Sequence, residues 1–195
     1  GMSLTAGVSP PISFMPPDLI WDANGAGAGV RDGGGLWINS TNTWWNGTTN
    51  LNWADNYNAQ IGAGGAGGTI TLDTVTANRV TFTNFTGTYT LASGTLNIMS
   101  NLTVANSAGS VVLTYIIGGP GGVTMGSSGS LRIYGLSPNT YSGGTIINRG
   151  TLIWGTMVSG TSRDCNCALG TGPVTLNSGA TLQFEKVNAT NALTL

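Results

Sequence analysis

The chain has no histidine and very little charge. Only 7% of its 195 residues are charged, compared with about 25% in an average soluble domain. Without histidine, neither a Ser–His–Asp triad nor a Cys–His pair can form. The 6 lysines and arginines are scattered singly and the formal net charge is −1, so a nucleic-acid partner is not expected.

Cysteine is also scarce. The two cysteines, Cys165 and Cys167, are separated by one residue, whereas zinc sites use C-x₂-C pairs or histidine partners. We therefore expect no metal and no cofactor. We interpret the pair as loop cysteines, either free or in a strained local or intermolecular disulfide.

The sequence has no apolar run near the length of about 18 residues that marks a membrane helix. We therefore expect no membrane insertion by this chain. Gly1 resembles the remnant of a cleaved tag, and the last residues, 192–195, stop within a strand-like run. The native protein is thus expected to continue, with a C-terminal β-barrel or an anchor segment.

The residues that are present favour β-structure. A hydrophobic fraction of 40% with few charges argues against disorder, and apolar residues alternate in short runs bounded by Gly, Asn, Ser and Asp. No segment shows a sustained helical period. The expected strands are Thr69–Leu72, Arg79–Thr83, Thr88–Leu91, Thr95–Met99, Leu102–Val104, Val111–Ile117, Gly122–Met125, Ser130–Tyr134, Thr145–Asn148, Thr151–Trp154, Val174–Asn177, Thr181–Phe184 and Leu193–Leu195.

These runs predict a coiled, all-β architecture. Repetition at a fixed spacing is typical of stacked folds, and a turn of about 20 residues would give roughly six turns over residues 69–195. The prediction is a parallel β-helix, or solenoid. A β-sandwich is the alternative, although it would need longer strands and clear two-residue hairpin signals.

One stretch carries a family resemblance. It reads N-T-Y-S-G-G-T-I-I-N-R-G-T-L from Asn139 to Leu152 and is followed by A-L-G-T-G-P-V-T-L-N-S-G-A-T-L from Ala168 to Leu182. This pattern resembles the passenger-associated transport repeat, also called the autotransporter-associated β-strand repeat. An inserted segment, 156–167, departs from the pattern and carries both cysteines.

The resemblance implies a right-handed parallel β-helix in a secreted bacterial surface protein, and it implies no reaction. The positions that match the repeat are Asn139, Tyr141, Ser142, Gly143, Gly144, Thr145, Asn148, Gly150, Thr151, Leu152, Leu169, Gly170 and Gly172.

Residues 1–68 differ from residues 69–195, and we expect them to form a separate capping segment before the solenoid repeats. Five of the 6 tryptophans fall between Trp21 and Trp53, a pattern that also resembles the opening segment of such passengers. The structural interpretation is a Trp-rich cap over the end of the coil. The functional interpretation is a glycan-binding platform formed by Trp44, Trp45, Asn46 and Trp53.

The acidic residues are too sparse to predict an active site. Glycoside hydrolysis needs two carboxylates about 5–10 Å apart, and lyases on β-helices often need clustered acids around calcium. We therefore expect no enzyme. The acids are Asp18, Asp22, Asp32, Asp55, Asp73, Asp164 and Glu185.

The sequence is compatible with two functions. The first is a structural stalk that supports secretion of an autotransporter-like passenger, secreted or held on the bacterial outer-membrane surface. The alternative is an adhesin-like module that binds glycans or cell-surface components through the N-terminal Trp/Asn cluster. An open solenoid end also allows end-to-end stacking of copies.

Overall fold

The computed structural model describes residues 15–26, 29–134, 138–155, 169–185 and 193–194. Over these ranges the chain forms 18 strands and no helix, as the alternating pattern predicted. The strands are β1 Asp18–Trp21, β2 Gly35–Trp37, β3 Trp44–Trp45, β4 Asn50–Leu51, β5 Tyr57–Ile61, β6 Thr69–Leu72, β7 Thr74–Phe82, β8 Gly87–Ala92, β9 Thr95–Val104, β10 Gly109–Leu113, β11 Ile116–Gly118, β12 Gly122–Met125, β13 Ser130–Tyr134, β14 Thr145–Ile147, β15 Thr151–Gly155, β16 Val174–Leu176, β17 Thr181–Glu185 and β18 Leu193–Thr194.

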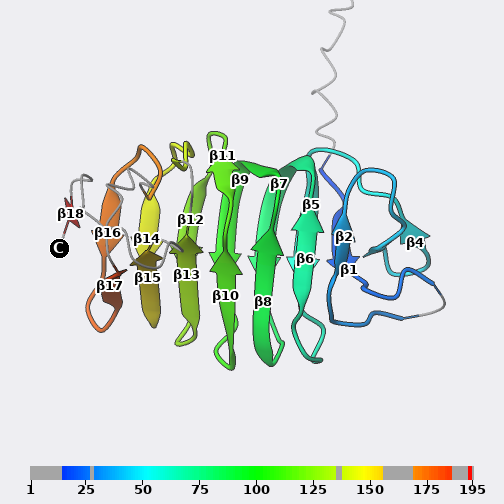
Figure 1. The fold of residues 1–195 in the computed structure, drawn as a ribbon, viewed down its shortest axis with the longest axis horizontal. Helices are drawn as coiled ribbons and strands as arrows, with labels where there is room; N and C mark the ends of the chain where they lie inside the picture. Colours follow the sequence, from blue (N-terminus) through cyan, green and yellow to red (C-terminus); the bar gives the residue numbers. More distant parts are fainter. Residues whose placement is uncertain (1–14, 27–28, 135–137, 156–168, 186–192, 195) are drawn as a thin grey trace, which may run out of the picture.

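The strands form two sheets that run the length of the molecule (Figure 1). One sheet has the order β18-β16-β14-β12-β9-β7-β5-β1-β3-β4, with β11 also paired to β9, and the other has the order β17-β15-β13-β10-β8-β6-β2. Strands that are neighbours in a sheet are therefore one coil apart in sequence. This arrangement is a β-solenoid of about 5 turns.

Register confirms the parallel coil. Val80 pairs with Leu102, Leu102 with Val123, and Val123 with Thr145, at sequence spacings of 22, 21 and 22 residues. The next step, from Thr145 to Val174, takes 29 residues because it includes the inserted segment. The sandwich alternative is wrong, because sandwich sheets are antiparallel, whereas among the described strands the only antiparallel pairs are β1 with β3 and β3 with β4.

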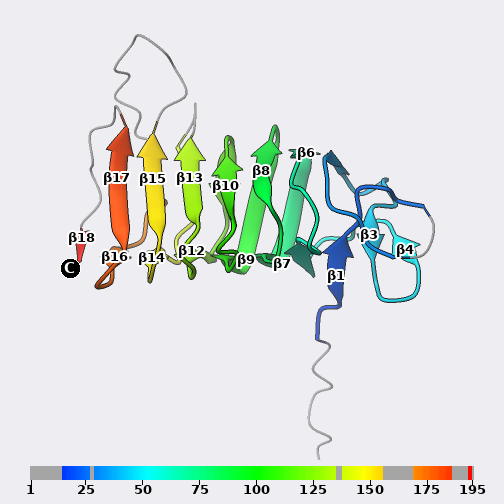
Figure 2. The same cartoon turned by 90° about the horizontal axis from the view of Figure 1, so that it is seen from below.

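The turns in the middle of the coil each have three straight sides. In β9 the alternation of buried and exposed residues breaks at Met99 and Ser100, which are both exposed. The first half of β9 pairs with β11 and the second half with β12. The break is therefore a corner that divides the longer sheet into two faces, and the shorter sheet forms the third (Figure 2).

Inward side chains stack in columns along the coil. Val80, Leu102 and Val123 form one such column and are all buried. Residues beside them in each strand point outward, as Thr81 and Thr103 do. Since strands in a sheet are about 4.8 Å apart, each inward residue packs directly on its equivalents in the turns before and after.

The N-terminal residues continue the same two sheets. β1 and β5 pair in parallel with each other, β5 pairs with β7, and β2 pairs with β6. Their buried side chains belong to the same hydrophobic cluster as those of the later turns. The boundary at residue 68 stays a prediction.

We predict that Leu102→Ala lowers the free energy of unfolding by about 2–5 kcal/mol, because truncating a buried leucine leaves a cavity. Leu102 is 0% exposed. The measurement is urea unfolding followed by circular dichroism. Thr81→Ala, on the outward face of the same sheet, is the control and should change stability by less than about 0.5 kcal/mol; equal losses in the two variants would contradict the inward column.

Candidate functional site

The repeat motif begins at a corner of the coil, where two of its side chains turn inward. Asn139 is buried, and its Oδ1 accepts a hydrogen bond from the amide of Ile117 at 2.8 Å. Tyr141 is also buried, and its hydroxyl lies 2.6 Å from Oγ1 of Thr145. Asn139 thus holds its turn on the previous one, whereas Tyr141 bonds to Thr145 within the same turn.

Thr145 is a polar residue in an otherwise apolar column, between Val123 and Val174. Its Oγ1 donates to the carbonyl of Leu169 at 3.3 Å, and the Tyr141 hydroxyl can then donate to Thr145. Burial raises the pKa of the Tyr141 phenol well above its usual value, an effect only partly opposed by the Thr145 hydrogen bond. The phenol therefore stays protonated and available as a donor.

The motif glycines occur where backbones of successive turns touch. A Cβ on Gly143 would lie 2.6 Å from the backbone of Gly121, and one on Gly172 would lie 2.5 Å from that of Gly144. Gly144, Gly150 and Gly170 have φ of 84°, 69° and 67°, values that glycine adopts without steric cost. These positions set the corners of the coil.

The other motif residues take ordinary places in the solenoid. Leu152 and Leu169 are buried, Thr151 is half-buried in β15, and Ser142 is exposed. Oδ1 of Asn148 accepts a hydrogen bond from Nδ2 of Asn177 in the next turn at 2.6 Å. The two cysteines lie outside the described residues.

The N-terminal end of the coil holds a cluster of buried indoles. Trp21, Trp37 and Trp44 are 0% exposed and Trp53 is 2% exposed. Trp37 and Trp44 meet edge to face with ring centroids 4.8 Å apart, and Trp37 and Trp53 do so at 4.9 Å. The arrangement matches the predicted cap, and it withdraws Trp44 and Trp53 from the surface that the glycan-platform interpretation assigned to them.

Trp45 faces the other way. It follows Trp44 in β3, so strand alternation turns its side chain outward, and it is half-buried. Asn46 is exposed, but its Oδ1 accepts from the amides of Thr48 and Thr49 at 2.9 Å each. Of the four predicted glycan-binding residues, Trp45 therefore has the only partly exposed indole, while Asn46 shapes the turn beside it.

Two carboxylates hold the surrounding loops. Asp22 is buried; its Oδ1 accepts from the amide of Arg31 at 3.0 Å and its Oδ2 from Nδ2 of Asn50 at 2.7 Å. Asp22 thereby ties the loop after β1 to β4. It is a structural group, bonded on both oxygens.

Asp32 has a similar role in the adjacent layer of the coil. Its Oδ2 accepts from the amides of Ala63 at 2.8 Å and Gly65 at 2.6 Å, and its Oδ1 accepts from the Tyr89 hydroxyl at 2.6 Å. Burial, followed by this hydrogen bond, raises the pKa of Tyr89 well above its usual value, so Tyr89 remains the donor. The Gly-rich loop after β5 is fixed in this way.

A polar cleft of about 340 Å³ opens beside Trp45. Its volume is in the range of small-molecule sites, about 300–1,000 Å³. None of its lining residues is charged, and they bring together one indole, two carboxamides, two hydroxyls and loop backbone. They are Gly25, Ala26, Asn42, Trp45, Thr48, Thr49 and Asn50.

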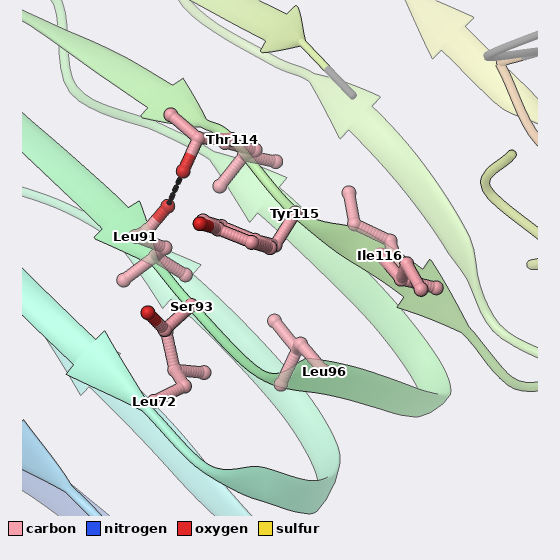
Figure 3. Close-up of a pocket in the computed structure, with 9 residues that line it drawn as sticks. Leu72, Leu91, Ser93, Leu96, Thr114, Tyr115 and Ile116 are labelled. Carbon is pink, nitrogen blue, oxygen red and sulfur yellow. Dashed lines mark hydrogen bonds between the residues drawn. The ribbon is translucent and has the colours of Figure 1, made fainter. Parts of the chain in front are cut away.

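A second hollow is too small to be a site. It lies at the corner between β10 and β11, where Tyr115 is half exposed and Oγ1 of Thr114 donates to the carbonyl of Leu91 at 3.0 Å (Figure 3). Its volume is about 10 Å³, which holds about one water molecule. We interpret it as a packing gap at the corner.

Two other kinds of site are absent from the described ranges. These ranges contain no group of three or more His, Cys, Asp or Glu side chains placed to hold a metal ion. Nor do they contain a helix long and apolar enough to cross a bilayer.

Sequence reasoning missed most of the cleft. Asn42, Thr48 and Thr49 were not among the candidates, because their meeting depends on the loop that Asp22 holds. The one local signal was the Trp44–Trp45 pair, since alternation in a strand sends one ring inward and the other outward.

The chain is similar to a bacterial autotransporter adhesin. It is 31% identical over 189 residues to the adhesin BmaC autotransporter of Brucella suis biovar 1 (strain 1330), an alignment that includes 91% of the chain. The chain spans only 5% of that adhesin's length. No family model matches the chain, and no solved structure matches it. The weak homology and the β-solenoid together fit an autotransporter-type passenger.

We predict that Gly143→Ala destabilises the protein by about 1–3 kcal/mol, because the added methyl group would lie against the backbone of Gly121. Gly126→Ala is the matched control, since a Cβ there meets its nearest atom at an ordinary 3.5 Å. Thermal unfolding of the two variants compares them. A Gly143 variant as stable as the Gly126 variant would show that the turns are not in contact at this glycine.

We predict that iodide quenches one class of tryptophan fluorescence and that Trp45→Phe removes it. The reason is that Trp21, Trp37, Trp44, Trp53 and Trp154 are at most 2% exposed, whereas Trp45 is half-buried. Stern–Volmer titration of the folded chain gives the accessible fraction. Strong quenching that persists in Trp45→Phe would contradict the buried cap.

Proposed function

We propose that the chain is a stiff structural segment of a secreted or surface-exposed autotransporter-like passenger, built from repeats of the passenger-associated transport kind. The observation that carries the proposal is the parallel pairing of successive turns, from β5 to β18 in one sheet and from β2 to β17 in the other. Strand pairing joins each described turn of the coil to the next. Such a coil is suited to hold another part of a protein away from a surface.

The stacking also supports a role in secretion. In a solenoid each repeat contacts only its neighbours, so a folded turn is the template for the next one. Stepwise folding outside the cell would then oppose backward movement of the chain and favour export without ATP. This role is what the family resemblance implies, and Asn139 and Gly143 contribute to it, Asn139 by its hydrogen bond to the amide of Ile117 and Gly143 by its close approach to Gly121 in the previous turn.

A second candidate is an adhesin-like role. The similar Brucella protein is named an adhesin, and here the cleft beside Trp45 is formed by residues suited to polar ligands. The two roles are compatible, because the cleft is at the capped end and the motif lies in later turns. Neither role requires a reaction, and we propose no enzymatic activity.

The test of the structural role is surface display. We predict that deleting residues 139–182 from the full-length protein reduces the amount displayed on the cell, because the deletion removes β14, β15 and β16 and some of β17. Surface antibody labelling and protease accessibility measure display. Gly143→Ala should reduce it in the same direction and Gly126→Ala should not. Undiminished display of the deletion variant would overturn the proposal.

A further inference from the structure

We propose, building on the adhesin-like role above, that the cleft beside Trp45 is a binding site for a neutral saccharide. The site belongs to the turn-and-hairpin region around β3 and β4 and does not use the buried tryptophans. It would take an uncharged sugar unit with its ring against the Trp45 indole and its hydroxyls toward Asn42, Thr48 and Thr49.

The Trp45 indole is carried by a strand that is fixed in position. Trp45 is held from both sides in β3, since it pairs with Ile20 of β1 and with Asn50 of β4. Behind it, Trp44 packs edge to face on Trp21 at 5.4 Å and on Trp37 at 4.8 Å. A ring carried by a strand that is anchored in this way is preorganised, and its electron-rich face attracts the polarised C–H groups of a sugar.

The polar lining supplies groups that can bond to sugar hydroxyls. Asn42 is exposed and uses its Nδ2 in a long, 3.4 Å bond to the carbonyl of Gly25, which leaves its Oδ1 to accept from a ligand hydroxyl. Thr48 and Thr49 are exposed, and their amides are bonded to Asn46. Their backbone is thereby fixed, and both residues line the cleft. A few placed polar groups around an aromatic surface are typical of small-ligand sites.

The charge around the cleft disfavours anionic ligands. The lining has no lysine or arginine, and one lining residue, Asn50, donates a hydrogen bond to the buried carboxylate of Asp22. An anionic ligand would find no partner of opposite charge and would lie near a negative group. The cleft therefore favours a neutral sugar over a uronic acid or a phosphorylated compound.

Asn50 is not a suitable position for the test. Its Nδ2 holds Asp22 at 2.7 Å, so its loss would leave a buried carboxylate oxygen without this donor and disturb the loop. Trp45 and Asn42 are better positions, because their side chains are not needed to bridge the loops at such short distances.

The experiment is a titration of the purified 195-residue chain with glucose, galactose, mannose and N-acetylglucosamine at millimolar concentrations, with glucuronate as the charged probe. Indole N–H signals in ¹H–¹⁵N spectra report binding, and the Trp45 signal is assigned from Trp45→Phe. We expect at least one neutral sugar to shift the Trp45 signal selectively, with glucuronate binding more weakly than glucose. Tighter binding of glucuronate would overturn the preference for neutral ligands.

Variants separate the cleft from binding elsewhere. Trp45→Ala should weaken the binding at least about tenfold, Asn42→Ala by a smaller factor, and Trp45→Phe should retain some of the affinity. Tyr115→Ala, which removes another half-exposed aromatic side chain, should bind as the unmodified chain does. The signals of the buried indoles confirm that each variant is folded.

The titrations distinguish failure of the cleft as the binding site from failure of the glycan-binding role itself. Sugar binding that is unchanged in Trp45→Ala would overturn the cleft as the site but leave an adhesin-like role standing. No binding of any sugar in the panel would overturn the cleft and the glycan-binding role together. The structural role in the passenger is unaffected by either result, because surface display tests it separately.

Discussion

The parallel register between successive turns is the constraint on which the rest of the structure depends. An inward side chain packs against the equivalent side chains of the turns before and after it. A change in its size or polarity must therefore be compensated by residues of those turns. Thr145 shows how such an exception is accommodated. It interrupts an apolar column, and Tyr141 and the carbonyl of Leu169 supply its hydrogen bonds. The repeat motif thus provides local solutions to a problem that the stacking itself creates.

Most of the fold could be predicted because the solenoid is built from local patterns. Alternation placed the strands, and the spacing of turns followed from their repetition. The strands β1 to β5 were not predicted individually, and two details of residues 69–195 could not be predicted in this way. The run from Val111 to Ile117 is interrupted, because Thr114 bonds to the previous turn and the chain changes direction there. The first half of β7, from Thr74 to Ala77, was missed because small and polar residues weaken its pattern.

The candidate site was less accessible to sequence reasoning. The concentration of tryptophans between Trp21 and Trp53 predicted the cap. It also suggested Trp44 and Trp53 as ligand-binding residues, although both are buried in the structure. Which indole is exposed depends on the pairing of β3 with β1, a contact between residues about two dozen positions apart. The polar lining depends in turn on Asp22, whose buried carboxylate joins segments that have no shared pattern. Long-range hydrogen bonds of this kind leave no periodic signal.

The antiparallel pairing of β3 and β4 has a consequence for how the coil grows. β3 runs against both β1 and β4, so β4 runs in the same direction as the coil strands. It is only two residues long, however, and offers a further turn very little edge to pair with. At the edge of the second sheet, the carbonyl of Leu36 is covered by the hydroxyls of Thr41 and Thr43. The described residues therefore leave little free strand edge at this end of the stack on which another turn or another copy of the chain could pair.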